Sequence, residues 1–435
     1  MNDNYKRTIF SWSIYDFANQ PFTTITVTFI YSVFFAKFIF GDAIEGAAAW
    51  GIAITLSSII IALLSPVMGA IADKGGYRKI FLVFWTWVCI FFSFLLYLPE
   101  KGDVFLALLF FSIANIGFEM GGVFLNAYLP EIAPKDKIGR ISGYGWSFGY
   151  IGGLIALAIC YLLFMYPENP VNPITGSMLD KNTGEHYRII NVFIAFWFAL
   201  FSIPTFIYVK SVNYKNKKTE NIVLESFSTI KKTFKEIRKY KQIVRFLIAR
   251  VIYNDAIITV IAFGGLYATT QFGFDEKNGK LFLFAIVLNV FAGLGAFLLG
   301  FLDDYIGGKK TIQVTNWGFI IACVIAFIAP LLDSGELLFW VAGALIGIFM
   351  GPNQAASRSL MGRLIPKSKE SEFYGFFAFS GKATAFLGPL LFSLVISYTG
   401  SMRGAILMIA VLFLLGSFLL SRVDAEEGIR IAEDN

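Results

Sequence analysis

The segment 69–79, which reads GAIADKGGYRK, occurs a second time in altered form at 300–310, which reads GFLDDYIGGKK. Each copy places an aspartate four residues after its first glycine, then another glycine, then two adjacent basic residues. Two further pairs of segments keep the same spacing to within one residue. They are 117–121 (GFEMG) with 347–351 (GIFMG), and 134–143 with 366–375. Because self-similarity at one offset marks a duplicated structural unit, the chain is predicted to consist of two homologous halves.

The composition is that of a membrane protein. Of the 435 residues, 57% are hydrophobic and 15% are charged, whereas soluble domains are about 45–50% apolar and 25% charged. Soluble enzymes, disordered chains, collagens and disulfide scaffolds are thereby excluded. The cysteines Cys89, Cys160 and Cys323 fall in apolar runs, so no disulfide or zinc framework is predicted. We expect no removable signal peptide, because the first long apolar run has no small-residue cleavage site.

Twelve apolar runs are long enough to cross a bilayer. They cover residues 9–40, 47–72, 80–99, 104–129, 141–166, 189–209, 243–272, 280–302, 311–331, 336–361, 373–399 and 404–421. The sequence therefore predicts an all-α polytopic membrane protein with twelve transmembrane helices in two parallel six-helix pseudo-repeats. Since each half crosses the membrane an even number of times, the halves share one orientation, as in many secondary transporters.

The predicted domains are an N-terminal bundle at 1–209, a cytoplasmic linker at 210–242 and a C-terminal bundle at 243–435. In the linker, apolar residues from Val223 to Ile237 recur at helical spacing among lysines and arginines. This pattern is typical of an amphipathic helix that lies on the membrane surface. We expect it to act as a tether between the two bundles.

Lysine and arginine residues predict the orientation. The loops on the side of the termini hold most of the 36 such residues. The opposite loops hold Lys37, Lys101, Lys181, Arg188, Lys277, Lys280 and Arg403. The positive-inside rule then places both termini in the cytoplasm. The net charge of +6 is accounted for by loops that face anionic lipid, so no nucleic-acid partner is expected. The abundance of Lys, Asn, Ile and Phe is typical of an AT-rich bacterial genome, which predicts the cell membrane as the location.

The repeated segments resemble the inner-loop motif of the major facilitator superfamily. Within that superfamily, three segments resemble the branch named after the yeast autophagy-related vacuolar amino-acid effluxer. They are 11–22 (SWSIYDFANQPF), 126–133 (NAYLPEIA) and 139–153 (GRISGYGWSFGYIGG). This resemblance implies the major facilitator fold and solute transport, and it suggests amino-acid efflux. Two positions depart from the pattern: Tyr77 replaces a basic residue of the loop motif, and Gln20 replaces a small residue of the branch.

The resemblance also implies a set of gating residues. They are Gly69, Asp73, Arg78, Gly300, Asp304 and Lys309. Asp73 and Asp304 end their helices at the inner surface, where they are expected to lock a closed gate. Asp73 would face the positive end of a helix in the other half.

Six ionisable residues fall within the predicted spans. They are Asp16, Glu119, Arg250, Asp255, Arg358 and Lys382. Charges at such depth are costly, face the bundle interior and commonly mark a substrate or ion pathway. The alternative is that some of them form static ion pairs that fix helix packing.

The first span carries the acid Asp16 close to the amides of Asn19 and Gln20. Pro21 lacks an N–H group, so the carbonyl of Phe17 loses its helical partner and the helix can bend there. An acid, two amides and a free carbonyl would suit the ammonium of a zwitterion or a coupling cation. The seventh span offers an equivalent pair, Asn254 and Asp255.

The fourth and tenth spans have matching interruptions at Gly121-Gly122 and Gly351-Pro352, which predict a transport site. Glu119 and Asn126 flank the first interruption, and Asn353, Gln354 and Arg358 follow the second. Arg358 could pair with a substrate carboxylate or with Glu119 as a gate. With Lys382, these residues complete the predicted pathway.

Glycines of two spans predict close helix packing between the halves. They are Gly145, Gly149, Gly152 and Gly153 in the fifth span, and Gly293 and Gly295 in the eighth.

We expect neither an enzyme nor a cofactor. The only histidine, His186, lies in an outer loop, where we expect a surface residue rather than a proton relay. Residues 375–382 resemble a phosphate loop, but their glycine spacing is wrong and they lie in an apolar span. Transport would then be driven by gradients.

The sequence therefore predicts a monomeric secondary transporter of a small polar solute, namely an amino acid or related metabolite. Proton coupling through Asp16, Glu119 or Asp255 is the favoured energetics, because a carboxylate in a low-dielectric cavity can carry a proton. The alternatives are an exporter of drugs or other metabolites, and a transport-dead sensor or scaffold.

Overall fold

The computed structural model describes residues 3–173, 175–210, 239–274, 279–367, 369–385 and 387–434. Within these ranges twelve helical segments are long and apolar enough to cross a membrane, which confirms the predicted number of spans. An even number of crossings puts both termini on the same side of the bilayer. The predicted linker helix at 223–237 lies outside the described residues.

The first repeat contains six spans. They are α1 (Asp3–Pro21) continued by η1 (Phe22–Phe29), α2 (Tyr31–Phe34) and η2 (Phe35–Phe40); α3 (Ala43–Gly75); α4 (Arg78–Leu95); α5 (Val104–Asn126) with α6 (Leu129–Ile132); α7 (Ile138–Cys160) with η3 (Tyr161–Met165); and α8 (Glu185–Tyr208).

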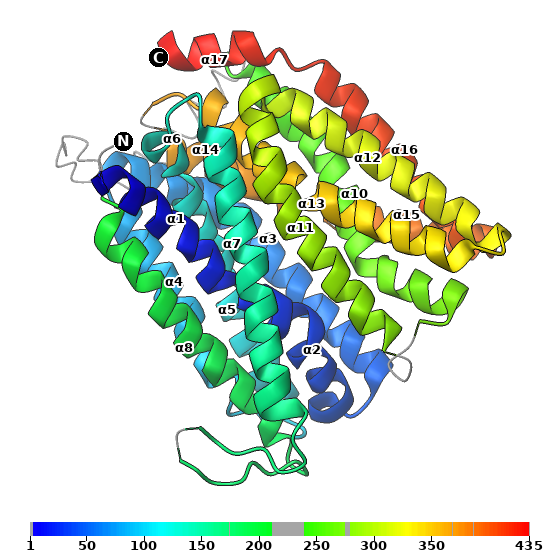
Figure 1. Ribbon diagram of the computed structural model, residues 1–435. Coiled ribbons are helices and arrows are strands. Elements are labelled where there is room, and N and C mark those ends of the chain that lie inside the picture. The colour runs from blue at the N-terminus through cyan, green and yellow to red at the C-terminus, as the bar shows by residue number, and fades with distance from the viewer. Residues whose placement is uncertain are drawn as a thin grey trace. The chain divides into compact units, whose positions relative to one another are not determined.

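The second repeat also contains six spans, followed by a terminal helix. They are α10 (Lys241–Phe272), α11 (Lys280–Ile306), α12 (Gly308–Ile328) with η4 (Ala329–Leu331), α13 (Gly335–Leu364), α14 (Glu370–Lys382) with α15 (Leu387–Thr399), α16 (Met402–Ser421) and the short α17 (Ala425–Asp434). In Figure 1, α11 lies beside α13, and α12 lies beside α16.

Large apolar side chains are exposed along the spans. Leu63 is 66% exposed and Phe105 is 78% exposed. Polar side chains such as Asn353 and Ser357 are instead fully buried. This distribution suits a chain whose outer surface contacts lipid and whose polar groups must be satisfied internally.

The contacts group the described residues into two compact units. One unit joins Ser65–Gly75 and Asn126–Ser147 of the first repeat to the second repeat. The other contains the remaining described parts of the first repeat. The last part of α3 and the first part of α7 therefore belong to the same unit as the second repeat, and their contacts with that repeat lie inside this unit.

Equivalent glycines make equivalent contacts in this unit. A Cβ atom added to Gly143 of α7 would lie 2.4 Å from the carbonyl oxygen of Ala296 in α11. A Cβ added to Gly375 of α14 would lie 2.3 Å from the carbonyl oxygen of Ser65 in α3. Since these four positions correspond under the sequence repeat, the duplication is also visible in the helix packing.

The predicted interruptions in the fourth and tenth spans are wrong. Both α5 and α13 run as continuous helices through Gly121-Gly122 and Gly351-Pro352. Gly351 instead allows close packing, because its Cβ would lie 2.2 Å from the carbonyl oxygen of Ala292. Prolines and glycines are tolerated inside membrane helices where neighbouring helices fill the space. An interruption of the α-helix is found instead in the eleventh span, between α14 and α15.

Two of the prolines inside helices, Pro21 and Pro352, are each matched by a glycine of the adjacent helix. Pro21 deprives the Phe17 carbonyl of its helical donor, and a Cβ on Gly152 would lie 2.4 Å from that oxygen. Pro352 does the same to the Ile348 carbonyl, which a Cβ on Gly295 would approach to 2.0 Å. These glycines therefore pack within one repeat, whereas the sequence led us to expect packing between repeats.

The expectation that His186 is a surface residue is also wrong. It lies in the first turn of α8 and is only 8% exposed. The centroid of its ring lies 4.1 Å from that of the Tyr187 ring. The polar composition of the preceding loop gave no indication of this packing.

Gly375→Ala tests the glycine contact. The added methyl group must push α14 away from α3, so we expect a loss of about 1–3 kcal/mol, as for other overpacking changes, and a lower unfolding temperature of the purified protein in detergent. Gly122→Ala is the control, since its Cβ meets nothing within 4 Å. Equal unfolding temperatures for the two variants would contradict this assignment.

Candidate functional site

Asp73, at the end of α3, caps the amino end of α14. Its Oδ1 accepts a hydrogen bond from the amide of Ser371 at 3.1 Å, and its Oδ2 accepts one from the amide of Glu372 at 2.8 Å. The first amides of a helix have no partner within the helix, and the positive end of the helix dipole favours an anion. Gly69 makes the approach possible, because its Cβ would lie 2.2 Å from the Ser371 carbonyl oxygen.

Asp304, near the end of α11, caps the amino end of α7 in the same way. Its Oδ1 accepts hydrogen bonds from the amides of Gly139 at 2.8 Å and Arg140 at 3.3 Å. A Cβ on Gly300 would lie 3.1 Å from the Arg140 Cα. The two capped positions on α7 and α14 correspond under the repeat, so the caps form an equivalent pair, each joining one repeat to the other.

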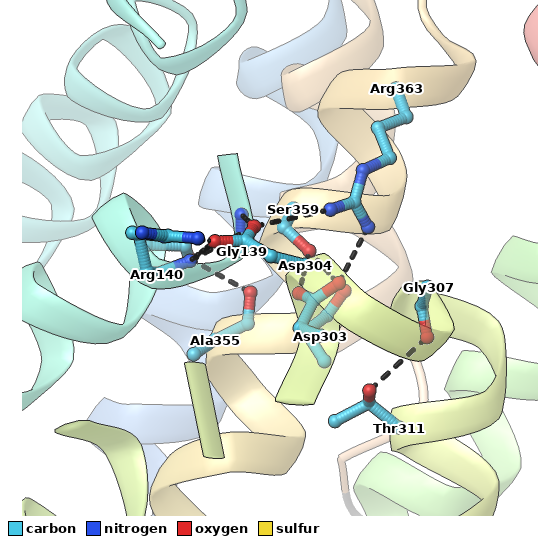
Figure 2. Close-up of polar contacts among 11 residues, drawn as sticks. Gly139, Arg140, Asp303, Asp304, Gly307, Thr311, Ala355, Ser359 and Arg363 are labelled. Atoms are coloured by element: carbon cyan, nitrogen blue, oxygen red, sulfur yellow. Dashed lines mark hydrogen bonds and ion pairs between the residues drawn. The ribbon is translucent and has the colours of Figure 1, made fainter. Parts of the chain in front are cut away.

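Around Asp304 the cap extends into a charged network (Figure 2). The Arg140 guanidinium forms an ion pair with Asp304. Arg363 of α13 donates to Asp303 Oδ1 at 2.5 Å and lies 3.6 Å from Asp304 Oδ1, while Ser359 also donates to Asp303. Figure 2 shows these side chains converging from α7, α11 and α13. We call Asp73, Asp304, Arg140, Asp303 and Arg363, with the two capped helix ends, the gate cluster.

Sequence reasoning missed three members of the gate cluster. Asp303 directly precedes the motif aspartate, and Arg140 occupies the first turn of α7. Arg363 ends α13. The only signal for them was proximity to the repeat motif, because partners from helices distant in sequence cannot be read from spacing.

Arg358 of α13 also binds the first repeat. Its Nε and one terminal nitrogen donate to the hydroxyl and carbonyl oxygens of Ser142, at 2.9 and 2.6 Å. The other terminal nitrogen donates to Asn126 Oδ1 at 3.2 Å. The Tyr374 hydroxyl donates to the Arg358 carbonyl at 2.9 Å. Arg358 thus joins α13 to α7 and to the end of α5.

The other two charged residues of the predicted gating set are Lys309 and Arg78. Lys309 donates to the carbonyl oxygen of Ser421 in α16 at 3.1 Å. Arg78 begins α4 and is 6% exposed.

The predicted polar residues of the seventh span come together with residues of α13 and α14. Gln354 donates to Asn254 Oδ1 at 3.4 Å, and Asn254 donates to the Gly381 carbonyl at 3.4 Å. Thr384 donates to Asp255 Oδ1 at 3.5 Å. These distances exceed the 2.7–3.2 Å typical of strong hydrogen bonds, so the groups are only weakly engaged.

Two further basic residues belong to the same part of the second repeat. Arg250 donates to the Phe377 carbonyl at 2.8 Å and to the Ser380 hydroxyl at 2.7 Å, and its guanidinium lies 3.6 Å from the Phe377 ring centroid. Lys382, a predicted pathway residue, is half-buried at the end of α14.

Asn353 has short hydrogen bonds inside the bundle. It is fully buried and donates to Thr315 at 2.8 Å and to Asn316 at 2.9 Å, both on α12. These contacts pin α13 to α12.

In the first repeat, Asn19 is buried while Asp16, Gln20 and Glu119 are half-buried. Asp16 and Gln20 of α1 face α7, since a Cβ on Gly149 would lie 3.6 Å from the Asp16 Cβ and from Gln20 Oε1.

The Phe17 carbonyl, expected to be free, accepts a hydrogen bond from the Trp197 indole at 3.2 Å. The expectation of a free carbonyl is therefore wrong, because a tryptophan of α8 supplies the donor that Pro21 removes.

The sequence profile of the family described as "Vacuole effluxer Atg22 like" matches residues 38–140 and 135–433. The chain is 30% identical to a Bacillus subtilis (strain 168) protein called uncharacterized MFS-type transporter YxiO, over 97% of this chain and 96% of that protein. It is 27% identical to autophagy-related protein 22-1 of Aspergillus fumigatus over 67% of this chain, and the match spans 49% of that longer protein.

Solved structures share the fold. The human organic anion transporter MFSD10 superposes with a TM-score of 0.74 at 11% identity, covering 97% of this chain and 100% of that one. The proton:xylose symporter XylE superposes with a TM-score of 0.70 at 13% identity, covering 99% and 98%. The superpositions support the major facilitator fold, with its two parallel six-helix repeats. At such low sequence identity they support nothing more specific.

Asp73→Asn and Asp304→Asn test the two caps separately. Hydrogen bonds to charged groups contribute about 1.5–3 kcal/mol, so each variant is expected to speed amide hydrogen exchange about tenfold or more in its own helix start. The affected residues are 370–374 for Asp73→Asn and 138–142 for Asp304→Asn. Asp333→Asn, in an exposed loop, serves as the control, and unchanged exchange in both segments would rule out the capping role.

Proposed function

Because the chain belongs to the Atg22-like vacuole effluxer family of the major facilitator superfamily, we propose that it moves a small polar solute across the membrane by alternating access. The observation that carries this proposal is the equivalent pair of caps, at Asp73 on α14 and at Asp304 on α7. Each cap joins the two repeats at one membrane face, and each can be made or broken as the repeats rock.

The gate cluster is the proposed barrier on the side of the termini. The two caps, the Arg140 ion pair and the Arg358 contacts to Ser142 and Asn126 hold α3, α5 and α7 against the second repeat. Release of these contacts would open that side. Between the two roles proposed for Arg358, its bonds to Ser142 and Asn126 favour gating over substrate binding.

The proposed substrate is an amino acid or a related metabolite. Support comes from the weakly engaged groups of Asn254, Asp255, Gln354 and Thr384, which can exchange their long hydrogen bonds for bonds to a solute. A carboxylate beside amides and a hydroxyl suits an ammonium group with polar neighbours. The name of the family supports export.

The proposed energy source is the proton gradient. Asp16, Glu119 and Asp255 are carboxylates within membrane spans, and such groups in transporters commonly relay protons. We further propose that both termini face the cytoplasm, that the protein lies in the cell membrane and that it works as a monomer. The excess of lysine and arginine on the terminal side supports the first of these statements.

Transport in proteoliposomes tests substrate and coupling together. We expect the wild type to accumulate radiolabel from a mixture of the twenty proteinogenic amino acids when a pH gradient is imposed. Among Asp16→Asn, Glu119→Asn and Asp255→Asn, the variant that lacks the coupling acid should lose accumulation but keep exchange of preloaded solute.

The outcomes are separable. If all three variants retain gradient-driven accumulation, proton coupling is wrong. If the wild type moves no amino acid but moves other metabolites identified by thermal-shift screening, only the substrate class is wrong. If it moves nothing, the alternative of a transport-dead sensor replaces the proposal. Glu45→Gln, an exposed residue in the first turn of α3, is the control.

A further inference from the structure

The eleventh span is not one helix. The α-helical segment α14 ends at Lys382 and α15 begins at Leu387, and residues 383–385 form a turn, called the α14–α15 turn here. The Ala385 amide donates to the Lys382 carbonyl, three residues back, at 3.4 Å. The Gly381 carbonyl, which Ala385 would serve in a continuous helix, instead accepts a hydrogen bond from Asn254 at 3.4 Å.

Asp255 of α10 lies against this turn. Asp255 is only 3% exposed. The hydroxyl of Thr384, which lies in the turn itself, donates a hydrogen bond to Asp255 Oδ1 at 3.5 Å. A Cβ on Gly388, in the first turn of α15, would lie 2.7 Å from the Asp255 carbonyl oxygen. The backbone of α15 thus packs directly on α10 where the acid is placed.

Asp255 forms no ion pair within 4.0 Å in the described part of the chain, and its single side-chain hydrogen bond there is the long one from Thr384. A buried carboxylate with so weak a partner is costly when ionised. The site therefore calls for a cation or a proton on the acid.

The acids of the surrounding helices lie in the first turns of α14 (Glu370 and Glu372) and α13 (Glu336), whereas the other charged groups named here are basic. Arg250 lies five residues earlier on α10 and Lys382 ends α14, while Arg358 lies on α13. The Arg250 guanidinium is engaged by Phe377 and Ser380, and that of Arg358 by Ser142. The helix α15 carries no charged residue, and α16 carries only Arg403, in its first turn. The phenol of Tyr253, on α10, is bonded to Ser357.

The helix α14 links this turn to the gate cluster. Its first amides are capped by Asp73, and its last residue borders the turn beside Asp255. Thirteen residues at a rise of 1.5 Å each make α14 about 20 Å long. A conformational change at the turn can therefore tilt or rotate α14, whose amino end belongs to the gate cluster.

We propose that the α14–α15 turn is the proton-coupling site of the transporter, with Asp255 as the proton carrier and α14 as the connection to the gate cluster. This inference rests on the proposed transport function. A hydronium ion gives its proton to a carboxylate oxygen of Asp255, leaving water and a neutral acid. The neutral acid stabilises the present conformation, with the gate cluster formed, and loss of the proton to water favours release of the caps.

Spin-label distances across the gate test the proposal without a known substrate. Asp136→Cys and Lys367→Cys introduce labels at two exposed positions, one in the α6–α7 loop and one between α13 and α14. The three native cysteines are buried. In wild-type protein, in sodium-free buffer, we expect a single short distance at low pH and a growing fraction of longer distances as the pH rises.

Asp255→Asn should keep the short distance at every pH, because an amide resembles the protonated acid. Thr384→Val should retain the response with its midpoint moved to higher pH by less than one pH unit, since one weak donor to the ionised acid is lost. Asp333→Asn, in an exposed loop, should behave as wild type.

The proposal is overturned by a wild-type pH response in Asp255→Asn, or by a wild-type distance that sodium at constant pH changes and pH does not. In either case transport itself could still be detected in proteoliposomes, so failure of this inference differs from failure of the proposed function. A wild-type distance that never changes with pH also refutes coupling through the gate.

Discussion

A helix that begins inside a membrane protein presents amides that nothing in its own turn can satisfy, and two aspartates meet that requirement here. Asp73 serves the first amides of α14, and Asp304 serves those of α7. Each carboxylate comes from one repeat and each capped helix from the other. The attraction between an anion and the positive end of a helix dipole is strong over short distances and lost within a turn. Such contacts are therefore suited to holding two bundles together in one state and releasing them in another.

The glycines near each cap follow from this contact. The aspartates reach the opposing amides only if the backbones approach closely, and a Cβ on Gly69 or Gly375 would collide with a carbonyl oxygen or its neighbours. The caps are equivalent in backbone geometry, but one matched position differs in charge. Arg140, which pairs with Asp304, has Glu372 as its counterpart on α14.

Polar groups in the second repeat divide into two kinds by their hydrogen bonds. Asn353 has short bonds to α12 and fixes the bundle. Asn254, Gln354 and Asp255 have long bonds and converge on the turn in the eleventh span. Weakly bonded groups beside an interrupted helix can change partners at low cost, whereas a tightly bonded network resists change. The proposed substrate binding and proton coupling are accordingly assigned to the weakly bonded groups of Asn254, Gln354 and Asp255.

The sequence by itself determined the number of spans and the duplication, because apolar length and repeated spacing are local properties of the chain. The resemblance of its loop motif to that of the superfamily indicated Asp73 and Asp304. Only the tertiary structure decided that Trp197 donates a hydrogen bond to the Phe17 carbonyl, that Arg140 and Arg363 join Asp303 and Asp304, and that the eleventh span is interrupted. Glycine and proline disclose where a helix can be broken, but a neighbouring helix decides whether it is, by filling the space or supplying the missing partner.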